Sequence, residues 1–328
     1  MARDSIYSLV TYLTGEHPAV GVMVKGRIWE INGALNTLSA PAGPRTPKPV
    51  RTMLEVLESW DDCRPLLEET ARVLGANPPD DGLEASRARL LAPVPNPGKM
   101  MNVGLNFYDH AREMGMEIKE GFRPNFFWKG DRNGIIGPSQ DIRISSGFVD
   151  WEAELALVIG KVAKEVPPES AMDCVAGFTC HNDVTDRRLM MIPGGQLDFL
   201  AGKCRDTFAP LGPALVPKEQ IPDPSRLKIR CLVNGELMQD TGVDQMILDP
   251  AGCVSALSSI LTLQPGDVIG LGTGSGVGWT RGMTIGPGGL SEAVDRMLKG
   301  ETGVFLKPGD VVAVDIPGVG RLENRVAG

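Results

Sequence analysis

The sequence predicts a mainly β protein of the α+β class, with a small N-terminal α+β domain before a larger β domain. Short apolar runs recur from residue 99 to the C-terminus, separated by Gly, Pro and Asp, and this is typical of short strands joined by tight turns. Forty Gly and 26 Pro residues are spread along the 328-residue chain and form no low-complexity tail. Helical spacing is confined to a few segments, so helices are expected to be the minor component.

Residues 1–92 are the predicted N-terminal domain. Strands are expected over residues 7–13 and 18–33, the second range being a hairpin that turns at Lys25–Gly26. The segment 43–52 is rich in Pro and is expected to be a loop. Residues 53–75 have helical spacing, and Pro65 is expected near the first turn of a second helix. The boundary is placed near residue 93 because prolines cluster there, at positions 78, 79, 93, 95 and 97.

Residues 93–328 are the predicted β domain. Helices are expected near residues 107–115 and 250–263, and a short one at 291–300 inside a glycine-rich excursion, 279–304. Asn234–Gly235 suits a type I′ hairpin turn. The apolar runs that predict strands are 99–106, 154–163, 174–185, 227–237, 266–273 and 309–326.

Composition excludes some classes of function. A net charge of −8 with no basic run argues against a nucleic-acid surface. No apolar run is long enough to span a membrane and no signal peptide is visible, so a cytoplasmic protein without membrane contact is predicted. The six cysteines form no C-x-x-C pair, which favours free thiols.

A pair of acidic residues interrupts one apolar strand, in the stretch GFVDWEAELALVIGK at 147–161. Side chains alternate along a strand, so Glu152 and Glu154 point the same way. Asp183 follows another apolar run. Three carboxylates suit a hard cation, Mg²⁺ or Mn²⁺ with Ca²⁺ as an alternative, and leave positions for water and substrate. The competing interpretation is a solvated strand end.

Four other features could carry chemistry. His110 and Glu113 share a helix face, as a water-activating base and its partner would, or as a solvated surface pair. Lys203 lies among apolar residues and either meets an anion or extends its amine to solvent. The glycine run 270–279 invites a nucleotide-binding interpretation, but no helix is predicted to follow it. Cys180 beside His181 could be a nucleophile or zinc ligand, although no partner spacing supports this.

The order of the motifs carries more information than any one of them. Together they resemble the fumarylacetoacetate hydrolase family over residues 100–328. The resemblance is carried by VGLNFYDHAREM, FFWKG, DWEAELALVIGK, GFTCHNDVTDR, LAGKCRDTFAPLGP, VNGELMQ, LQPGDVIGLGTGSGVG and LKPGDVVAVDIPGVGRLEN.

The resemblance implies a mixed β-roll with the active site at its mouth, in a homodimer. It implies that Glu152, Glu154 and Asp183 bind Mg²⁺ or Mn²⁺. His110 and Glu113 look like the dyad that activates water, on a segment that closes over the substrate, and Lys203 looks like the active-site lysine. The residues implied to line the substrate pocket are Tyr108, Arg187 and Thr273.

The chain departs from the family pattern at several positions. Asp186, Arg188 and Met190 stand where the family has Ala, Asp and Gln, which puts the substrate's identity in doubt. Gly274 replaces a proline and is expected to loosen its loop. The excursion 279–304 is longer than usual and could cap the pocket or a dimer interface.

The predicted function is the metal-dependent hydrolysis of a C–C bond in a 1,3-dicarbonyl or acylpyruvate-like acid. In this scheme the metal acts as Lewis acid and the His–Glu pair activates water. The same pocket could instead serve a 2-oxo acid decarboxylase, isomerase or dehydratase. A non-catalytic homodimer that binds a small acid is a third alternative.

Overall fold

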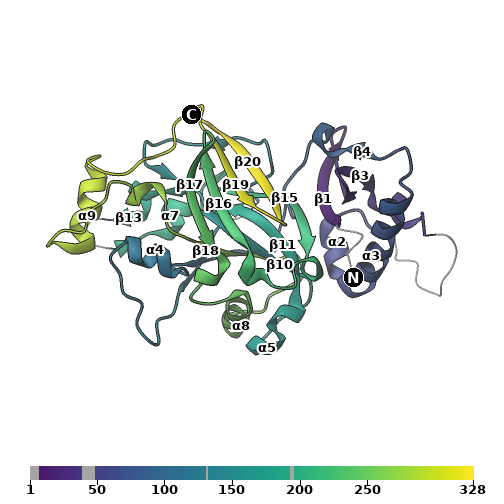
Figure 1. Cartoon of the computed structure of the whole chain (residues 1–328), viewed down its shortest axis with the longest axis horizontal. Helices are drawn as coiled ribbons and strands as arrows, with labels where there is room; N and C mark the ends of the chain where they lie inside the picture. Colours follow the sequence, from purple (N-terminus) through teal and green to yellow (C-terminus); the bar gives the residue numbers. More distant parts are fainter. Residues whose placement is uncertain (1–6, 39–48, 131, 193–195) are drawn as a thin grey trace.

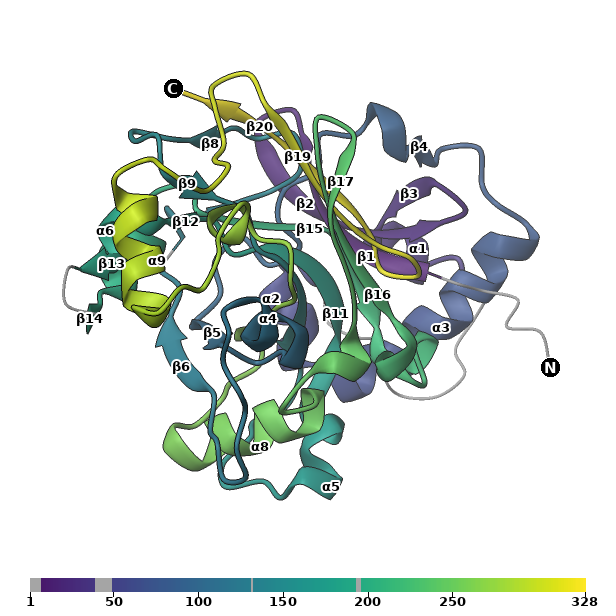
Figure 2. The ribbon, with the colours of Figure 1, turned by 60° about the vertical axis from the view of Figure 1, so that its left-hand side comes forward.

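We describe the protein from a computed structural model, which covers residues 7–38, 49–130, 132–192 and 196–328. The loop predicted over 43–52 therefore lies largely outside the described residues. One large sheet of eleven strands runs through the molecule, and a second sheet of five strands packs near it (Figures 1 and 2). The predicted mainly β, α+β class is confirmed.

The large sheet begins in the N-terminal segment and continues into the rest of the chain, because β1 pairs with β15 through Leu9 and Leu215. In spatial order its strands are β4 (Leu83–Glu84), β3 (Arg27–Glu30), β2 (His17–Val24), β1 (Tyr7–Thr14), β15 (Ala209–Pro217), β11 (Val175–Asn182), β10 (Ala153–Ile159), β18 (Val268–Thr273), β5 (Met100–Gly104) and β6 (Asn125–Trp128), with β7 (Ile135–Ile136) beside β15.

The second sheet contains both C-terminal strands. Its order is β17 (Glu236–Gly242), β16 (Lys228–Val233), β19 (Val311–Ile316), β20 (Gly320–Ala327) and β8 (Ile142–Arg143). Two smaller pairs join β9 (Val149–Asp150) to β12 (Thr185–Asp186) and β13 (Met191–Ile192) to β14 (Gln196–Leu197).

Two predicted hairpin turns are confirmed by their backbone geometry. Lys25 and Gly26 both have positive φ, and so do Asn234 and Gly235. Positive φ at both central residues is the requirement of a type I′ turn, whose twist matches that of the two flanking strands. These turns join β2 to β3 and β16 to β17.

The helices are α1 (Ile31–Leu35), α2 (Met53–Glu58), α3 (Trp60–Ala76), α4 (Tyr108–Glu113), α5 (Pro168–Ala171), α6 (Arg187–Met190), α7 (Phe199–Lys203), α8 (Pro250–Ile260) and α9 (Gly289–Leu298). Five of them (α2, α3, α4, α8 and α9) lie where helical spacing predicts them, with different ends, whereas α1, α5, α6 and α7, each of four or five residues, were not predicted. The strand expected over 18–33 is also too long, because β3 ends at Glu30 and α1 begins at Ile31.

The prediction for Pro65 is wrong. The second helix, α3, begins at Trp60 and contains Pro65 in its interior. Proline cannot bond the carbonyl four residues earlier, which here belongs to Asp61. Asp61 is exposed, so water can take that bond. The break between α2 and α3 falls at Ser59 instead.

Strand β10 is the central positioning element. Its Leu155 and Leu157 pack into the core cluster shared with the second sheet, whereas Ala156 and Val158 pack into the cluster shared with the N-terminal helices. Both faces are therefore buried, as the continuous apolar run predicts. Because the N-terminal segment shares this core, the domain division at 92/93 stays a prediction.

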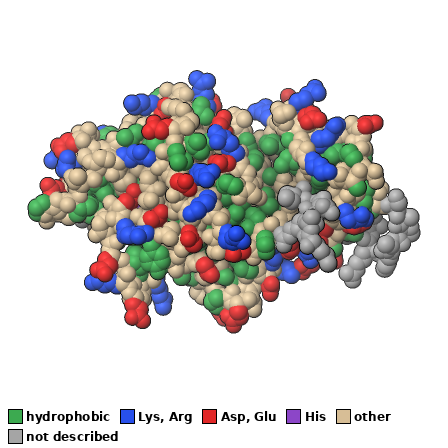
Figure 3. All heavy atoms as spheres, in the orientation of Figure 1, with side chains coloured by type: hydrophobic (Ala, Val, Ile, Leu, Met, Phe, Trp, Pro, Cys, Tyr) green, Lys and Arg blue, Asp and Glu red, His purple; other side chains and the backbone are tan. Residues whose placement is uncertain are grey.

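The outer surface mixes charges. On the face drawn in Figure 3, acidic and basic side chains are interspersed. No helix among the described residues is long and apolar enough to cross a membrane. Helix α9 lies at one end of the molecule and the N-terminal strands at the other (Figure 1).

Candidate metal centre

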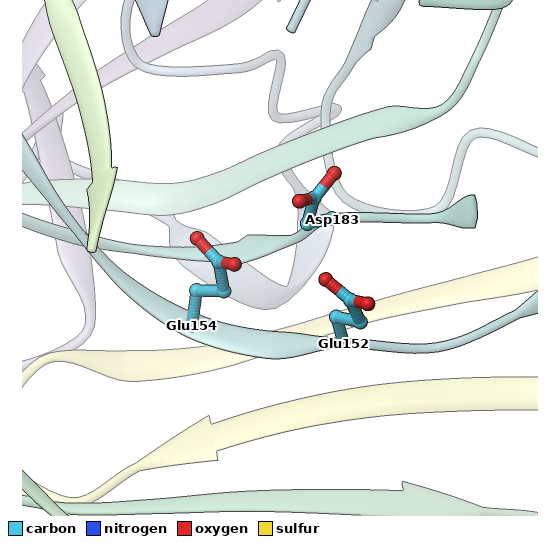
Figure 4. Close-up of side chains that lie close together, drawn as sticks. All are labelled: Glu152, Glu154 and Asp183. Atoms are coloured by element: carbon cyan, nitrogen blue, oxygen red, sulfur yellow. The ribbon is translucent and has the colours of Figure 1, made fainter. Parts of the chain in front are cut away.

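Three buried carboxylates meet where β10 and β11 lie side by side. Ala153 pairs with Asn182, and the Asp183 backbone N–H donates to the Glu152 carbonyl at 2.8 Å. This register brings Glu152, Glu154 and Asp183 together, each offering an oxygen within 4.8 Å of the others (Figure 4). All three are at most 5% exposed, so the interpretation as a solvated strand end is wrong.

The arrangement fits a divalent cation. Oxygens bound to one ion at 2.0–2.6 Å lie at most about 4–5 Å apart, which the observed spacing satisfies. An all-oxygen donor set suits Mg²⁺, Mn²⁺ or Ca²⁺ more than softer metals. The carboxylates that would hold the ion are therefore Glu152, Glu154 and Asp183.

Lysine side chains partly balance this negative charge. Lys203 Nζ lies 2.7 Å from Glu152 Oε2 and 2.6 Å from Asp183 Oδ2, and Lys129 Nζ lies 2.6 Å from Asp183 Oδ1. Burial alone would raise the pKa of Asp183, but the two ammonium groups hold that pKa well below its usual range. Asp183 is thus kept ionised.

Glu154 differs from its two neighbours. Burial, with Asp183 and Glu152 close by, raises the pKa of Glu154 well above its ordinary value. Among the described residues Glu154 forms no ion pair, and its nearest side-chain donor is Asn102 Nδ2, 3.4 Å from Oε2. A bound cation would supply the missing positive charge and hold Glu154 ionised.

Arg187 orients Glu152 from the other side. Its guanidinium donates to Glu152 Oε1 and, through Nε at 2.8 Å, to the fully buried Asp150. Arg187 lines the cavity as expected, yet two protein carboxylates already engage it. Its role as a clamp for a substrate carboxylate stays a prediction.

The predicted dyad forms on α4. His110 Nδ1 lies 2.5 Å from Glu113 Oε1, three residues away on one helix face. The second oxygen of Glu113 accepts from the Gly276 N–H at 2.9 Å and from Thr280 Oγ1 at 3.0 Å. A carboxylate at Nδ1 favours the tautomer that leaves Nε2 as the basic nitrogen of His110.

One cavity of about 440 Å³ is lined by His110 of the dyad and by Glu152 and Asp183 of the triad, while Glu113 and Glu154 are not part of its lining. The predicted site residues in its lining are His110, Glu152, Asp183, Arg187, Lys203 and Thr273. Thr273 Oγ1 donates to the Ala153 carbonyl and accepts from Gln239, so protein groups already occupy this hydroxyl. Six residues predicted from scattered motifs therefore line a single site.

Tyr108 was expected to line the substrate pocket and does not. Its side chain is 44% exposed. Tyr108 stands two residues before His110, and that offset turns a helix by about 200°. When His110 faces the cavity, Tyr108 faces away from it. The structure does not bring Tyr108 to the site.

Most of the departures from the family pattern also lie away from the cavity. Asp186 accepts from the Leu189 N–H as the N-cap of α6 and from Ser146 Oγ. Arg188 is exposed, with its guanidinium over the Phe148 ring. Met190 alone among these three lines the cavity. The expected charge reversal therefore does not reach the substrate space.

Steric crowding explains why residue 274 is a glycine. A Cβ there would lie 2.4 Å from Thr241 Cγ2, closer than atoms can approach. The Gly274 carbonyl also accepts from Gln239 Nε2 at 3.0 Å. The loop is therefore tied to β17, and the expected loosening is not what the structure shows.

Two functional candidates were missed from the sequence. Lys129 is fully buried, and Asp150 accepts from Arg187 and from the Gly278 and Trp279 N–H groups. The alternation of side chains along an extended segment could have identified both residues. Lys129 stands two residues after buried Phe127, and Asp150 two residues before Glu152, so each shares a face with an inward-pointing neighbour.

The remaining motifs have structural explanations. Burial raises the pKa of the Cys180 thiol, which makes it a poor nucleophile and zinc ligand. The glycine run continues β18 into a short 3₁₀ turn, Gly278–Thr280, and the next helix, α9, begins eleven residues after that turn starts. Among the described residues no α-helix directly follows the run, so the strand–loop–helix order of a phosphate loop is missing.

His181 should give a measurable pH dependence of stability. Burial lowers the pKa of His181 to about 4, against about 6.5 in an unfolded chain. The unfolded state therefore binds a proton first, so the contribution of neutral His181 is present above about pH 6.5 and is lost as pH falls towards 4.

We expect His181 to remove roughly 2–3 kcal/mol of stability between pH 7 and pH 4.5. Urea unfolding of metal-free wild type and His181→Gln at both values isolates the effect, because the other titrating groups are shared. Equal pH slopes in the two proteins would show that His181 titrates normally.

The fold and site define a class of protein: a β-sheet scaffold with a buried carboxylate triad that could hold a metal ion, next to a cavity. Residues 99–327 match the family model described as fumarylacetoacetate (FAA) hydrolase C-terminal. The chain belongs to the fumarylacetoacetate hydrolase family, as its motifs predict, and it is an enzyme of that family.

The proteins that this chain is similar to are named for different reactions. The chain is 40% identical over 285 residues to the mitochondrial oxaloacetate tautomerase of Xenopus laevis, covering 86% of this chain and 80% of that protein. It matches a 5-carboxymethyl-2-hydroxymuconate delta-isomerase of Mycobacterium smegmatis at TM-score 0.60 and 33% identity, over 76% and 86% of the two chains.

A third relative carries a metal. The maleylpyruvate hydrolase of Sphingobium sp. SYK-6, solved with manganese(II) and pyruvate, matches at TM-score 0.71 and 25% identity over 98% of both chains. These similarities establish the family and the fold of the chain. They do not establish which reaction it catalyses, and that must be inferred from the chemistry of the site.

Proposed function

We propose that this protein is a metal-dependent enzyme that forms the enolate of a 2-oxo acid, and that keto–enol tautomerisation is its first reaction. The observation that supports this most is that His110, with Glu113 on Nδ1, lines the same cavity as Lys203 and two carboxylates of the triad, Glu152 and Asp183. Enolate formation needs at least one positioned base next to the site where the 2-oxo acid would bind.

A bound Mg²⁺ or Mn²⁺ would act as a Lewis acid that stabilises negative charge on substrate oxygens. His110 takes a proton from the carbon beside the 2-oxo group, and Glu113 stabilises the resulting imidazolium. His110 then gives the proton to the enolate oxygen, which completes the conversion of the keto form to the enol and returns His110 to its neutral state. Lys203 contributes positive charge next to Glu152 and Asp183 as the enolate forms.

Hydrolysis of a C–C bond is the second candidate. The same basic nitrogen of His110 could deprotonate a water that attacks the carbonyl of an acylpyruvate, releasing two acids. The similarity to a maleylpyruvate hydrolase favours this alternative, and the relatives named as tautomerase and isomerase favour the first. Both reactions pass through an enolate.

The deciding experiment uses metal-stripped protein with and without Mg²⁺ or Mn²⁺. Oxaloacetate and a set of acylpyruvates are incubated in D₂O and followed by NMR. Metal-dependent deuterium exchange beside the 2-oxo group, without cleavage, supports the tautomerase. Metal-dependent release of two acids supports the hydrolase. Absence of both with every compound, despite bound metal, would contradict the proposal.

Glu152→Gln tests the metal centre. The change keeps the shape of the side chain and removes one of the three carboxylate charges, so we expect Mn²⁺ binding to weaken roughly 100-fold or more and metal-dependent turnover to be lost. Isothermal titration with Mn²⁺ measures the first effect. Glu169→Gln, at an exposed position, is the matched control. Full activity in Glu152→Gln would remove Glu152 from the metal site.

Assembly and location remain proposals. We propose a homodimer, which light scattering after gel filtration would test. The prediction of a cytoplasmic protein is open, since the Xenopus laevis relative is named as mitochondrial.

A further inference from the structure

The cavity is larger and more apolar than the chemistry of a small diacid requires. Beyond its polar end, the lining contains a continuous group of apolar side chains that we call the apolar chamber: Met114, Met190, Met191, Phe199, Leu290 and Val294. These residues all belong to one hydrophobic cluster, which also contains Trp279 and Met297. The chamber is therefore one surface and not a set of scattered contacts.

Helix α9 supplies one wall of the apolar chamber. Leu290 and Val294 are four residues apart and line the cavity, while Ala293 and Met297 on the adjoining face are buried. The helix packs beside α6 and β13 at one end of the molecule (Figure 2). Residues of the excursion 279–304 line the cavity, which agrees with the first of its two expected roles, capping the pocket, and both roles stay predictions.

The excursion is closed at its base. Val304 N–H donates to the Gly278 carbonyl at 2.9 Å, and Gly303 N–H to the Arg281 carbonyl at 2.9 Å. The N–H groups of Gly278 and Trp279 in turn donate to buried Asp150 at 2.6 and 3.0 Å. This ties the base of the excursion to the Arg187–Glu152 side of the metal centre, so the wall is a built part of the cavity.

The chamber offers little to a second carboxylate. The described cavity lining contains three cationic side chains, Arg123, Arg187 and Lys203. Arg187 and Lys203 each bond two protein carboxylates, and Arg123 is exposed. A charged group placed against the methionines and α9 would lose its hydration without gaining a buried partner.

We propose that the apolar chamber binds an apolar substituent of the substrate. The preferred substrate is then a 2-oxo monocarboxylic acid with an alkyl or aryl group of several carbons, rather than a dicarboxylic acid such as oxaloacetate. This inference rests on the proposed 2-oxo acid chemistry for the polar end of the cavity. Methionine side chains adapt to different shapes, so the chamber should accept a range of chain lengths.

Binding tests this without turnover. Calorimetric titration of the Mg²⁺-loaded protein with 2-oxobutanoate, 2-oxohexanoate and 2-oxooctanoate should show affinity rising by about fourfold per methylene that enters the chamber. A Kd independent of chain length would overturn the inference. In parallel, kcat/KM should be greater for long-chain acylpyruvates than for oxaloacetate, and the reverse order would also overturn it.

Val294→Phe fills the chamber and should raise the Kd of 2-oxooctanoate roughly tenfold while leaving 2-oxobutanoate unchanged. Val304→Phe is the matched control, because it makes the same change at an exposed position of the excursion outside the cavity lining. An equal effect on both acids would contradict a chamber for the substituent. A different result would also overturn the inference: oxaloacetate is the preferred substrate, and Arg123→Gln abolishes its binding. The part of the cavity beyond the polar end would then bind a carboxylate through Arg123.

Failure of the proposed function would give a different result from failure of the apolar-chamber inference. It would appear as no metal-dependent conversion of any 2-oxo acid, whereas the chain-length series still reports whether the chamber takes apolar groups.

Discussion

Asp183→Asn is expected to lower the free energy of unfolding by roughly 3–5 kcal/mol and to abolish binding of divalent metal. Asp183 is the anion that both Lys129 and Lys203 contact, with Nζ to oxygen distances of 2.6 Å. Lys129 is fully buried, and its other Nζ contacts are the neutral carbonyls of Val184 and Lys203. Removing the carboxylate charge would leave a buried ammonium group without an anion.

Urea unfolding of the metal-free proteins measures the stability effect, and Mn²⁺ titration measures the metal site. Asp81→Asn, on an exposed turn, is the control for the substitution itself. The double variant Asp183→Asn, Lys129→Met should recover part of the lost stability, because no lone charge remains, yet it should still bind no metal. If the free energy of unfolding of Asp183→Asn lay within about 1 kcal/mol of the wild-type value, Lys129 would not depend on Asp183 for its charge compensation.

His110→Ala is expected to lower kcat by roughly 100- to 10,000-fold while Mn²⁺ affinity stays within about twofold of wild type. His110 is the base of the proposed proton transfer, but it lies on α4 and is not a member of the carboxylate triad. Glu113 keeps its bonds to Gly276 and Thr280 in the variant, so the local structure should persist.

Kinetics at saturating metal and isothermal titration with Mn²⁺ separate these two quantities. His17→Ala, at an exposed position of β2, is the control. Glu113→Gln should also lower kcat and should change the pH profile, because it removes the charge that supports the imidazolium. If His110→Ala retained kcat within about threefold, proton transfer would have to be assigned to another group.

Local patterns in the sequence were enough for the longer elements of the fold, whereas four short helices, α1, α5, α6 and α7, were missed because so few residues show no clear period. Strict alternation placed Glu152 and Glu154 on one side of a strand with two buried faces, and the structure has them so. Turn chemistry located both type I′ hairpins. Helix ends were less accurate, as at Trp60 and Pro65, because a solvent-exposed carbonyl tolerates a proline that local rules place at a first turn.

The Glu152–Glu154 pair and the dyad could be chosen from the sequence because each is a short spacing, i to i+2 on a strand or i to i+3 on a helix, which places both side chains on one face. Asp183 was added because it follows another apolar run. Their meeting in one cavity was implied by resemblance alone. The sequence could not show that Lys129 reaches Asp183 or that Asp150 ties the α9 excursion to Arg187.

Those contacts join segments that are distant in the chain, as in the bond from Lys129 Nζ to the Val184 carbonyl, across 55 residues. Their existence depends on which strands pair and in what register, which no local period encodes. By itself, then, the sequence determined the class of fold, its turns and the residue types of a carboxylate metal site. The tertiary structure decided which charges compensate one another and which apolar surface completes the cavity, because burial and distance are properties of the assembled sheet.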